Sequence, residues 1–220
     1  RIAEASCSGR FSFASWQLHL FARGRLPLAE VALAKGLGVM AISPADKGGR
    51  LFDPPELLRQ ACAPLDPLPL AYRFLLARGI STLTLGAAEP AELHWAGLTG
   101  GPLSELEQAA LERLHQQRQQ RLGPEACGQC RACLPCPQQV PIPELLRLRN
   151  LAVGHGMESF AKERYGLIGQ AGHWFEEINA AACRDCGDCL PRCPHHLAIP
   201  ELLADTHQRL ASPPRRRLWG

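Results

Sequence analysis

Two runs of four cysteines constrain this chain more than any other feature of its sequence. In the first run, two residues separate each cysteine from the next, from Cys127 to Cys136, and Pro137 follows directly. In the second run, from Cys183 to Cys193, the last spacing is three residues, and again a proline follows. Thiolates spaced three residues apart wrap a short loop around one iron–sulfur cubane, whereas the cysteine before the proline commonly ligates another cluster. The pattern therefore predicts two [4Fe–4S] clusters with crossed ligation, and hence electron transfer.

Crossed ligation divides the eight cysteines into two sets of metal ligands. We expect one cluster to be held by Cys127, Cys130, Cys133 and Cys193, and the other by Cys183, Cys186, Cys189 and Cys136. The first run is one residue shorter before its proline, which limits the reach of Cys136. If Cys136 cannot reach, one cluster should survive and the second should be labile or absent. Metal binding should contribute much of the folding free energy of this region.

Zinc and disulfides are the alternatives for these cysteines. Paired Cys-x-x-Cys knuckles can form a four-thiolate zinc site, but half of the cysteines would then have no role. Disulfides are disfavoured because the triplets are crowded, and because the reducing cytoplasm is the default compartment for a chain without a signal peptide. Cys7 and Cys62 lie outside both runs and should pack as small hydrophobic residues. His195 and His196 follow the last Cys-Pro and either tune a cluster by hydrogen bonding or are exposed loop residues.

Composition places the chain among globular proteins. Its residues are 46% hydrophobic and 20% charged, and the net charge of +3 is too small to imply a nucleic-acid partner. No apolar run reaches the roughly 18 residues that a membrane-spanning helix needs. Residues 213–220 form a basic tail that should be solvated. The start at Arg1, without a methionine, predicts that the chain is part of a longer protein.

The first hundred residues alternate short apolar runs with helical patterns, which is typical of β/α units and a parallel sheet. We expect strands at residues 11–20, 37–43 and 80–85, and helices at residues 27–35, 56–62, 70–78 and 90–95. A connecting helix should follow at residues 103–122. It begins with a capping box at Ser104 and Glu107, and Gly123 ends it. Its apolar stripe is expected to comprise Leu103, Leu106, Ala110 and Leu114.

The region after this helix contains an internal repeat. Residues 136–146 align without gaps on residues 193–203, so each cysteine run leads into a similar segment. In each copy a proline, Pro143 or Pro200, should begin a helix at its first turn.

The iron–sulfur domain should therefore span residues 123–212, as a small helical unit organised by its clusters. We expect residues 145–182, between the two repeats, to be mostly helical. Breaks are predicted at Gly154, Gly156, Gly166 and Gly172.

These features resemble the branch of the aldo/keto reductase family that carries a C-terminal ferredoxin-like domain. The resemblance rests on Ile42-Ser43-Pro44, Lys47-Gly48-Gly49, Thr84-Leu85-Gly86-Ala87, the first cysteine run with its Leu-Pro-Cys-Pro, and Arg149-Asn150-Leu151-Ala152. It covers nearly the whole chain, and it implies that residues 1–102 are the last three β/α units of a (β/α)8 barrel. The long spacing between the cysteine runs also resembles α-helical ferredoxins.

The resemblance implies NAD(P)H-linked reduction of a carbonyl in the complete protein. The family uses a tyrosine assisted by a lysine, an aspartate and a histidine, and all four come from the first half of the barrel, which this chain lacks. No catalytic residue is therefore assigned, and the expected partners are the missing barrel half or a redox partner. A hydride carrier moves two electrons and a cluster moves one, so a direct relay is chemically awkward. The alternative is a non-enzymatic iron–sulfur electron-transfer or adaptor protein.

The resemblance also implies contacts to the nicotinamide cofactor. The matching residues are Ser15 or Gln17 near the nicotinamide, Ser43, Pro44, Gly48 and Gly49 along the pyrophosphate, and Gly86, Ala87 and Ala88 in the phosphate-binding turn. Ile42 stands where many members of the family place a stacking tyrosine. No Lys or Arg directly follows Gly86 to hold a 2′-phosphate, so NAD and NADP both stay open. The alternative is that these glycines simply form turns.

Overall fold

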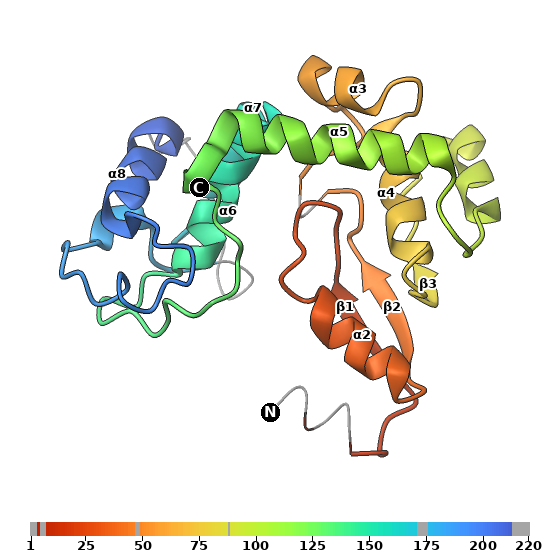
Figure 1. Cartoon of the computed structure of the whole chain (residues 1–220), viewed down its shortest axis with the longest axis horizontal. Coiled ribbons are helices and arrows are strands. Elements are labelled where there is room, and N and C mark those ends of the chain that lie inside the picture. Colours follow the sequence, from red (N-terminus) through yellow and green to blue (C-terminus); the bar gives the residue numbers. More distant parts are fainter. Residues whose placement is uncertain (1–3, 5–7, 47–48, 88, 171–175, 213–220) are drawn as a thin grey trace, which may run out of the picture. The chain divides into compact units, whose positions relative to one another are not determined.

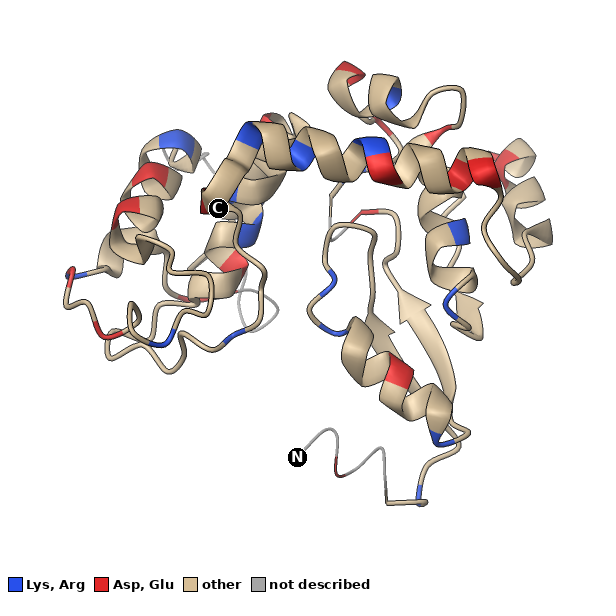
Figure 2. Ribbon diagram, in the orientation of Figure 1, with Lys and Arg blue, Asp and Glu red and all other residues tan. Residues whose placement is uncertain are grey.

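A computed structural model describes residues 4, 8–46, 49–87, 89–170 and 176–212 of the chain (Figure 1). The chain divides into two compact units, Arg1–Gln116 and Gln117–Gly220. The boundary falls within helix α5 (Glu105–Leu122), the helix that was expected to connect the two domains. This helix carries charged residues of both signs along its length (Figure 2). Among the described residues, no helix combines the length and the hydropathy that crossing a membrane requires.

The first unit contains a three-stranded parallel sheet in the order β1-β2-β3. The strands are β1 (Phe13–Gln17), β2 (Gly38–Ile42) and β3 (Thr82–Leu83). Phe13 pairs with Gly38, and Gln17 pairs with Ile42. The predicted parallel α/β arrangement is confirmed, with shorter strands than expected. β1 ends early because the chain turns after it, and His19 forms an isolated antiparallel bridge with Ala22.

Helices of the first unit follow the sequence prediction closely. They are α2 (Leu26–Ala34), α3 (Glu56–Cys62), α4 (Pro67–Leu76) and the 3-10 helix η1 (Pro90–Gly97). α4 begins before the predicted residue 70, because Pro67 and Pro69 lie in the first turn, where a helix needs no backbone amide donors. Phe74 of α4 is buried, with the Arg78 guanidinium 3.7 Å from its ring centroid.

His19 is a fully buried polar residue in this core. Its Nε2 lies 2.9 Å from the Gly49 carbonyl oxygen, and its Nδ1 accepts a hydrogen bond of 3.1 Å from the Phe21 amide. A carbonyl can only accept, so the ring carries a proton on Nε2. His19 therefore connects the segment just after β1 to the loop that follows β2.

The predicted capping box of α5 is present. The Ser104 amide donates to Glu107 Oε2 at 2.7 Å, and the Glu107 amide donates to Ser104 Oγ at 3.2 Å. Arg73 Nε also donates to Glu107, and this hydrogen bond is the main reason that the pKa of Glu107 is lowered. The predicted apolar stripe was wrong at Leu106, which is 58% exposed. Glu107 takes the inward position because it pairs with Arg73, and this turns Leu106 towards solvent.

The second unit is helical around two irregular cysteine loops. Its helices are α6 (Ile142–His155), α7 (Glu158–Gly166) and α8 (Ile199–Leu210), with short 3-10 turns η2 (Gly123–Glu125) and η4 (Ala180–Ala182). As predicted, Pro143 and Pro200 lie in the first turns of α6 and α8. Leucines of these helices, Leu145, Leu146, Leu151, Leu202 and Leu203, are buried and form the core.

The glycine breaks between the repeats were predicted only in part. Gly156, with φ +70°, ends α6 in the left-handed conformation that favours glycine. α7 ends at Gly166, whereas Gly172 lies outside the described residues. Gly154 is not a break but a residue within α6. A Cβ atom there would lie 2.8 Å from Leu122 Cδ1, so the missing side chain allows α5 to approach α6 closely.

Arg149 joins the two repeats of the second unit. It is 5% exposed, and its Nε donates to Asp205 Oδ2 of α8 at 2.7 Å, while its Nη2 donates to Glu125. Burial alone would raise the pKa of Asp205, but hydrogen bonds from Arg209 and Arg149 outweigh it and lower that pKa. The Arg149 guanidinium is buried while its carboxylate partners are partly exposed, so the ion pairs join α8 to α6 and satisfy a buried charge.

We predict that the effect of Gly154→Ala depends on Leu122. In a Leu122→Ala background, Gly154→Ala should raise the free energy of unfolding by about 1 kcal/mol, because alanine favours a helix interior. In the natural chain the gain should be smaller or reversed, since Leu122 must move. Urea unfolding of the four proteins of this double-mutant cycle measures the difference. An equal effect in both backgrounds would show that close approach is not the reason for the glycine.

Candidate metal centre

The two cysteine loops turn in the same way at three equivalent positions. Residues in the left-handed region occupy equivalent positions of the two loops: Gln129 and Asp185, Arg131 and Gly187, and Gln139 and His196, with φ between +51° and +75°. Left-handed residues turn a chain sharply, and most residue types adopt this conformation only when the surroundings hold it. The internal repeat found at residues 136–146 and 193–203 therefore extends back through both loops.

The Cys193 cavity is lined by Cys127, Cys130, Cys133 and Cys193. Its other walls include Ile142, Leu146 and Ile199. Three of its cysteines are buried, and Cys130 is exposed. Cys193 thus lies beside the triplet of the other run.

The Cys136 cavity is lined by Cys183, Cys186, Cys189 and Cys136. Its cysteines are more exposed than those of the Cys193 cavity, because Cys136 and Cys183 are half-buried and Cys186 is exposed. An open surface groove with three prolines on its walls also reaches Cys136. Although the first run is one residue shorter, Cys136 lies beside the triplet of the second run.

Crowding and burial oppose ionisation of these thiols in the absence of metal. Burial, with smaller contributions from nearby Cys127 and Cys130, raises the pKa of Cys133 to about 11. Burial also raises the pKa of Cys127 and of Cys189. Thiolates are the form that binds metal, so a cationic iron core that replaces the protons would stabilise each set.

The residues around the cavities fit [4Fe–4S] clusters. Each described cysteine is a free thiol, and each cavity combines four thiols with an apolar wall. Within the described ranges, no three His, Cys, Asp or Glu side chains converge on a site for a single metal ion; the thiols surround cavities instead. The Gln129 amide lies 3.4 Å from Cys127 Sγ and donates to it, a contact of the kind that tunes cluster potentials.

Ile142 and Arg192 are residues of the site that sequence analysis missed. Ile142 is 1% exposed and lines both cavities, so it separates them. Arg192 is the extra residue of the second run. Its Nη2 donates to the Pro135 carbonyl and its Nε to the Asp188 carbonyl, both at 2.9 Å, so it joins the two loops. In the sequence, only the longer last spacing of the second cysteine run pointed to a role for Arg192.

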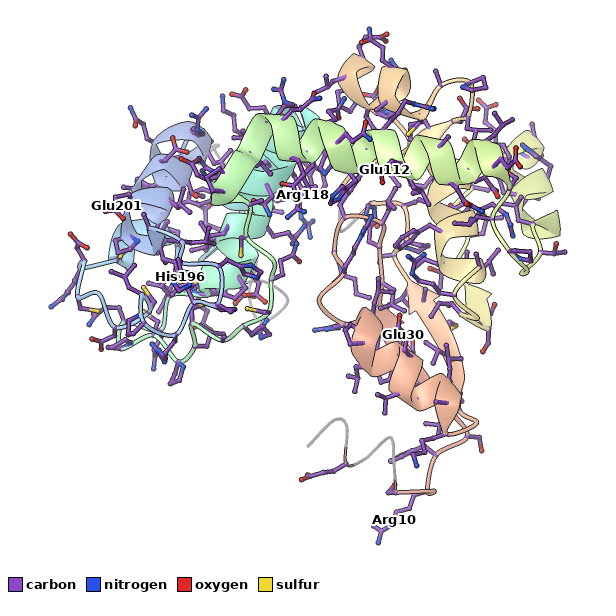
Figure 3. All side chains as sticks on the ribbon, in the orientation of Figure 1. Arg10, Glu30, Glu112, Arg118, His196 and Glu201 are labelled. Carbon is purple, nitrogen blue, oxygen red and sulfur yellow. The ribbon has the colours of Figure 1, made fainter. Side chains whose placement is uncertain are left out.

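Both histidines after the last Cys-Pro are exposed. His195 nevertheless lines the Cys193 cavity and lies over Gly128, where a Cβ atom would be 2.6 Å from His195 Nε2. Any other residue at position 128 would displace His195. His196 lies among the loops near the start of α8 (Figure 3).

The residues expected to contact a nicotinamide cofactor lie in the first unit. Gln17 ends β1 and is half-buried, whereas Ser15 is exposed on the same strand. Ser43 follows β2 with φ +52°, and its amide donates to Thr84 Oγ1 at 3.1 Å. Of the remaining expected residues, Pro44 and Gly49 are buried, Gly86 and Ala87 are exposed, and Gly48 and Ala88 lie outside the described residues.

A family model described as a 4Fe-4S dicluster domain matches residues 126–198. This segment is a 4Fe-4S dicluster domain. It binds two [4Fe–4S] clusters, which confirms the cofactors predicted from the two cysteine runs. No curated protein and no solved structure matches the chain significantly, so the expected relationship to aldo/keto reductases finds no support in these comparisons.

We predict that Ile142→Ala alters both clusters, because Ile142 lines both cavities. Ile199 is the matched control, since it occupies the equivalent position of the repeat but lines only the Cys193 cavity. Each variant should lower the free energy of unfolding by roughly 2–5 kcal/mol. Electron paramagnetic resonance of the reduced protein should show two altered signals for Ile142→Ala and one for Ile199→Ala. Identical spectra for the two variants would contradict this placement.

Proposed function

We propose that this chain is an electron-transfer protein that passes single electrons through the two clusters of its dicluster domain. A bound [4Fe–4S] cluster accepts and releases one electron at a time. The observation that carries the proposal is the pair of adjoining cavities, which share Ile142 and are each lined by four cysteines. Adjacent clusters favour passage of electrons from one to the other.

The proposal includes the crossed assignment of ligands. Cys127, Cys130, Cys133 and Cys193 hold one cluster, and Cys183, Cys186, Cys189 and Cys136 hold the other. It is supported by the lining of each cavity, in which a triplet from one run meets the last cysteine of the other run. It is also supported by proximity, since Cys193 is close enough to Cys127, and Cys136 to Cys189, to help raise the pKa of the Cys127 and Cys189 thiols.

The two clusters have unequal roles in this proposal. Three cysteines of the Cys136 cavity are exposed or half-buried, against one of the Cys193 cavity. Electron exchange with an external redox partner is faster for the cluster that lies closer to the surface. The cluster of the Cys136 cavity therefore exchanges electrons with the partner, and the cluster of the Cys193 cavity stores or relays them.

We predict that the anaerobically purified chain contains about eight iron and eight sulfide ions. Cys136→Ser should lower both to about four, because a serine oxygen holds iron poorly, and the remaining cluster should be the one bound by Cys127, Cys130, Cys133 and Cys193. Iron and sulfide analysis measures the counts. Adding Cys130→Ser to the Cys136→Ser variant should then remove the remaining cluster and abolish its spectroscopic signal.

Cys62→Ser is the control for this experiment. Cys62 is buried in the first unit, and burial raises its pKa to about 12, so it is a packed thiol rather than a ligand. This variant should keep about eight irons. If the natural protein is found to contain zinc and no sulfide, the electron-transfer proposal is wrong. Retention of two clusters in Cys136→Ser would overturn the crossed assignment alone.

A second candidate function, from the resemblance, is that the first unit contributes to a nicotinamide site of an aldo/keto reductase-type oxidoreductase. It is favoured by the order β1-β2-β3, in which consecutive parallel strands are neighbours, as in a (β/α)8 barrel. In a parallel sheet the carboxyl ends of the strands share one edge. Gln17, which pairs with Ile42, therefore lies near Ser43 at the edge where such barrels bind cofactors.

We predict for this second candidate that the chain quenches or enhances the fluorescence of NADH on binding. Gln17→Ala should weaken the binding about tenfold, which corresponds to the loss of one hydrogen bond. Glu112→Gln, a change on the exposed face of α5, is the control and should leave binding unchanged. Absence of any fluorescence change would remove the nicotinamide proposal for this chain and leave the electron-transfer proposal standing.

A further inference from the structure

The helix that follows each cysteine loop carries a polar residue at the same position of the internal repeat. When the ungapped alignment of residues 136–146 with residues 193–203 is continued along the helices, Asn150 of α6 falls opposite His207 of α8. Neither residue lines a cluster cavity. Each is nevertheless connected by hydrogen bonds to the segment where a cysteine loop begins.

Asn150 holds the backbone of Cys127 directly. Its Nδ2 donates to the Cys127 carbonyl at 2.8 Å, and its Oδ1 accepts from the Cys127 amide at 3.4 Å. Asn150 is only 5% exposed, so water does not replace these bonds when they are lost. Arg118 Nη2 also donates to the Cys127 carbonyl, at 3.3 Å. The position of Cys127 relative to α6 is therefore fixed by a buried amide.

His207 acts on the second loop through Tyr165 of α7. Tyr165 Oη lies 2.7 Å from His207 Nδ1 and accepts a hydrogen bond of 3.1 Å from the Ala180 amide. The Tyr165 oxygen has one hydrogen and two lone pairs, so it accepts from Ala180 and also shares a hydrogen bond with His207, whose direction follows the tautomer of the imidazole. Tyr165 and Ala180 are 4% and 3% exposed. Ala180 begins the turn η4, which leads directly into Cys183.

We propose that Asn150 and the Tyr165–His207 pair are equivalent positioning residues, each of which sets the geometry of one cluster by fixing the start of its cysteine loop. Asn150 serves the cluster of the Cys193 cavity, and Tyr165 with His207 serves the cluster of the Cys136 cavity. The assignment of an effect to one cluster rests on the proposed crossed ligation. The hydrogen bonds themselves do not depend on it.

The same helices begin just after the ligands that cross to the other cluster. α6 follows Cys136, and α8 follows Cys193. Asn150 therefore holds the loop that begins at Cys127 against α6, the helix that follows Cys136. His207, through Tyr165, holds the loop that begins at Cys183 against α8, the helix that follows Cys193. Residues that support metal ligands in this way typically change metal affinity by 10- to 100-fold when they are lost.

The test uses the full chain with both clusters, and the variants are Asn150→Leu and Tyr165→Phe. Iron release to a ferrous chelator should become roughly 10- to 100-fold faster for one cluster in each variant, and the midpoint potential of that cluster should shift. The Cys136→Ser background identifies the cluster. There, Asn150→Leu should still accelerate release, and Tyr165→Phe should have no effect.

Two further variants separate positioning from general stability. His207→Gln keeps a hydrogen-bond partner for the Tyr165 hydroxyl, since an amide both donates and accepts, and should retain natural release rates and potentials. His207→Leu should behave like Tyr165→Phe. Tyr72→Phe is the control, because Tyr72 is an equally buried tyrosine of the first unit. If Tyr165→Phe does not fold, comparison of His207→Gln with His207→Leu provides the test instead.

The proposal would be overturned if Asn150→Leu and Tyr165→Phe each changed the iron release rates and potentials of both clusters equally. Such a result would mean that these residues stabilise the second unit as a whole and do not position one cluster. Unchanged release rates and potentials in either variant would overturn it for that residue. Failure of the crossed assignment is recognised separately. In that case Cys136→Ser removes the cluster bound by Cys127, Cys130 and Cys133. Asn150→Leu and Tyr165→Phe, each made in the natural chain, still alter the release rate and potential of only one cluster.

Discussion

The exchange of the last cysteine between the two runs is the constraint on which the second unit depends. Each cavity is lined by a thiol from the opposite half of an internal repeat, so under the proposed crossed ligation neither half completes a metal site alone. The repeated loop conformation, with left-handed residues at equivalent positions, brings three thiols to one cavity and leaves the fourth directed to the other. Folding of this unit and assembly of its metal sites are therefore coupled, since binding energy at one cavity also orders the loop of the other.

The remaining contacts of the unit strengthen this exchange. Arg149 holds α8 against α6, and Arg192 joins the loops through two backbone carbonyls. Gly154 allows Leu122 to approach α6, so the end of α5 packs close to the helix that carries Asn150. Ile142 fills the space between the cavities. These residues lie on different elements, yet each one restrains the separation or the orientation of the two halves.

Features that depend on local chemistry could be predicted from the sequence. Proline at the first turn located the starts of α6 and α8, and the Ser104–Glu107 spacing located the start of α5. Features that depend on distant partners could not. Leu106 faces solvent because Arg73 pairs with Glu107, Gly154 is helical because of Leu122, and Asn150 matters because of Cys127. The cysteine spacing was an exception, since metal coordination makes a long-range arrangement visible as a short motif.

The unequal cover of the two cavities also bears on the behaviour of the protein in air. Small oxidants reach a cluster through its exposed ligands. In the Cys136 cavity Cys136, Cys183 and Cys186 are half-buried or exposed, whereas in the Cys193 cavity only Cys130 is exposed. Under the proposed ligand assignment we therefore expect oxidative damage to be ordered, with the cluster of the Cys136 cavity breaking down first and the cluster of the Cys193 cavity remaining. The internal repeat, although its two loops turn alike at equivalent positions, would thus separate a sacrificial centre from a protected one.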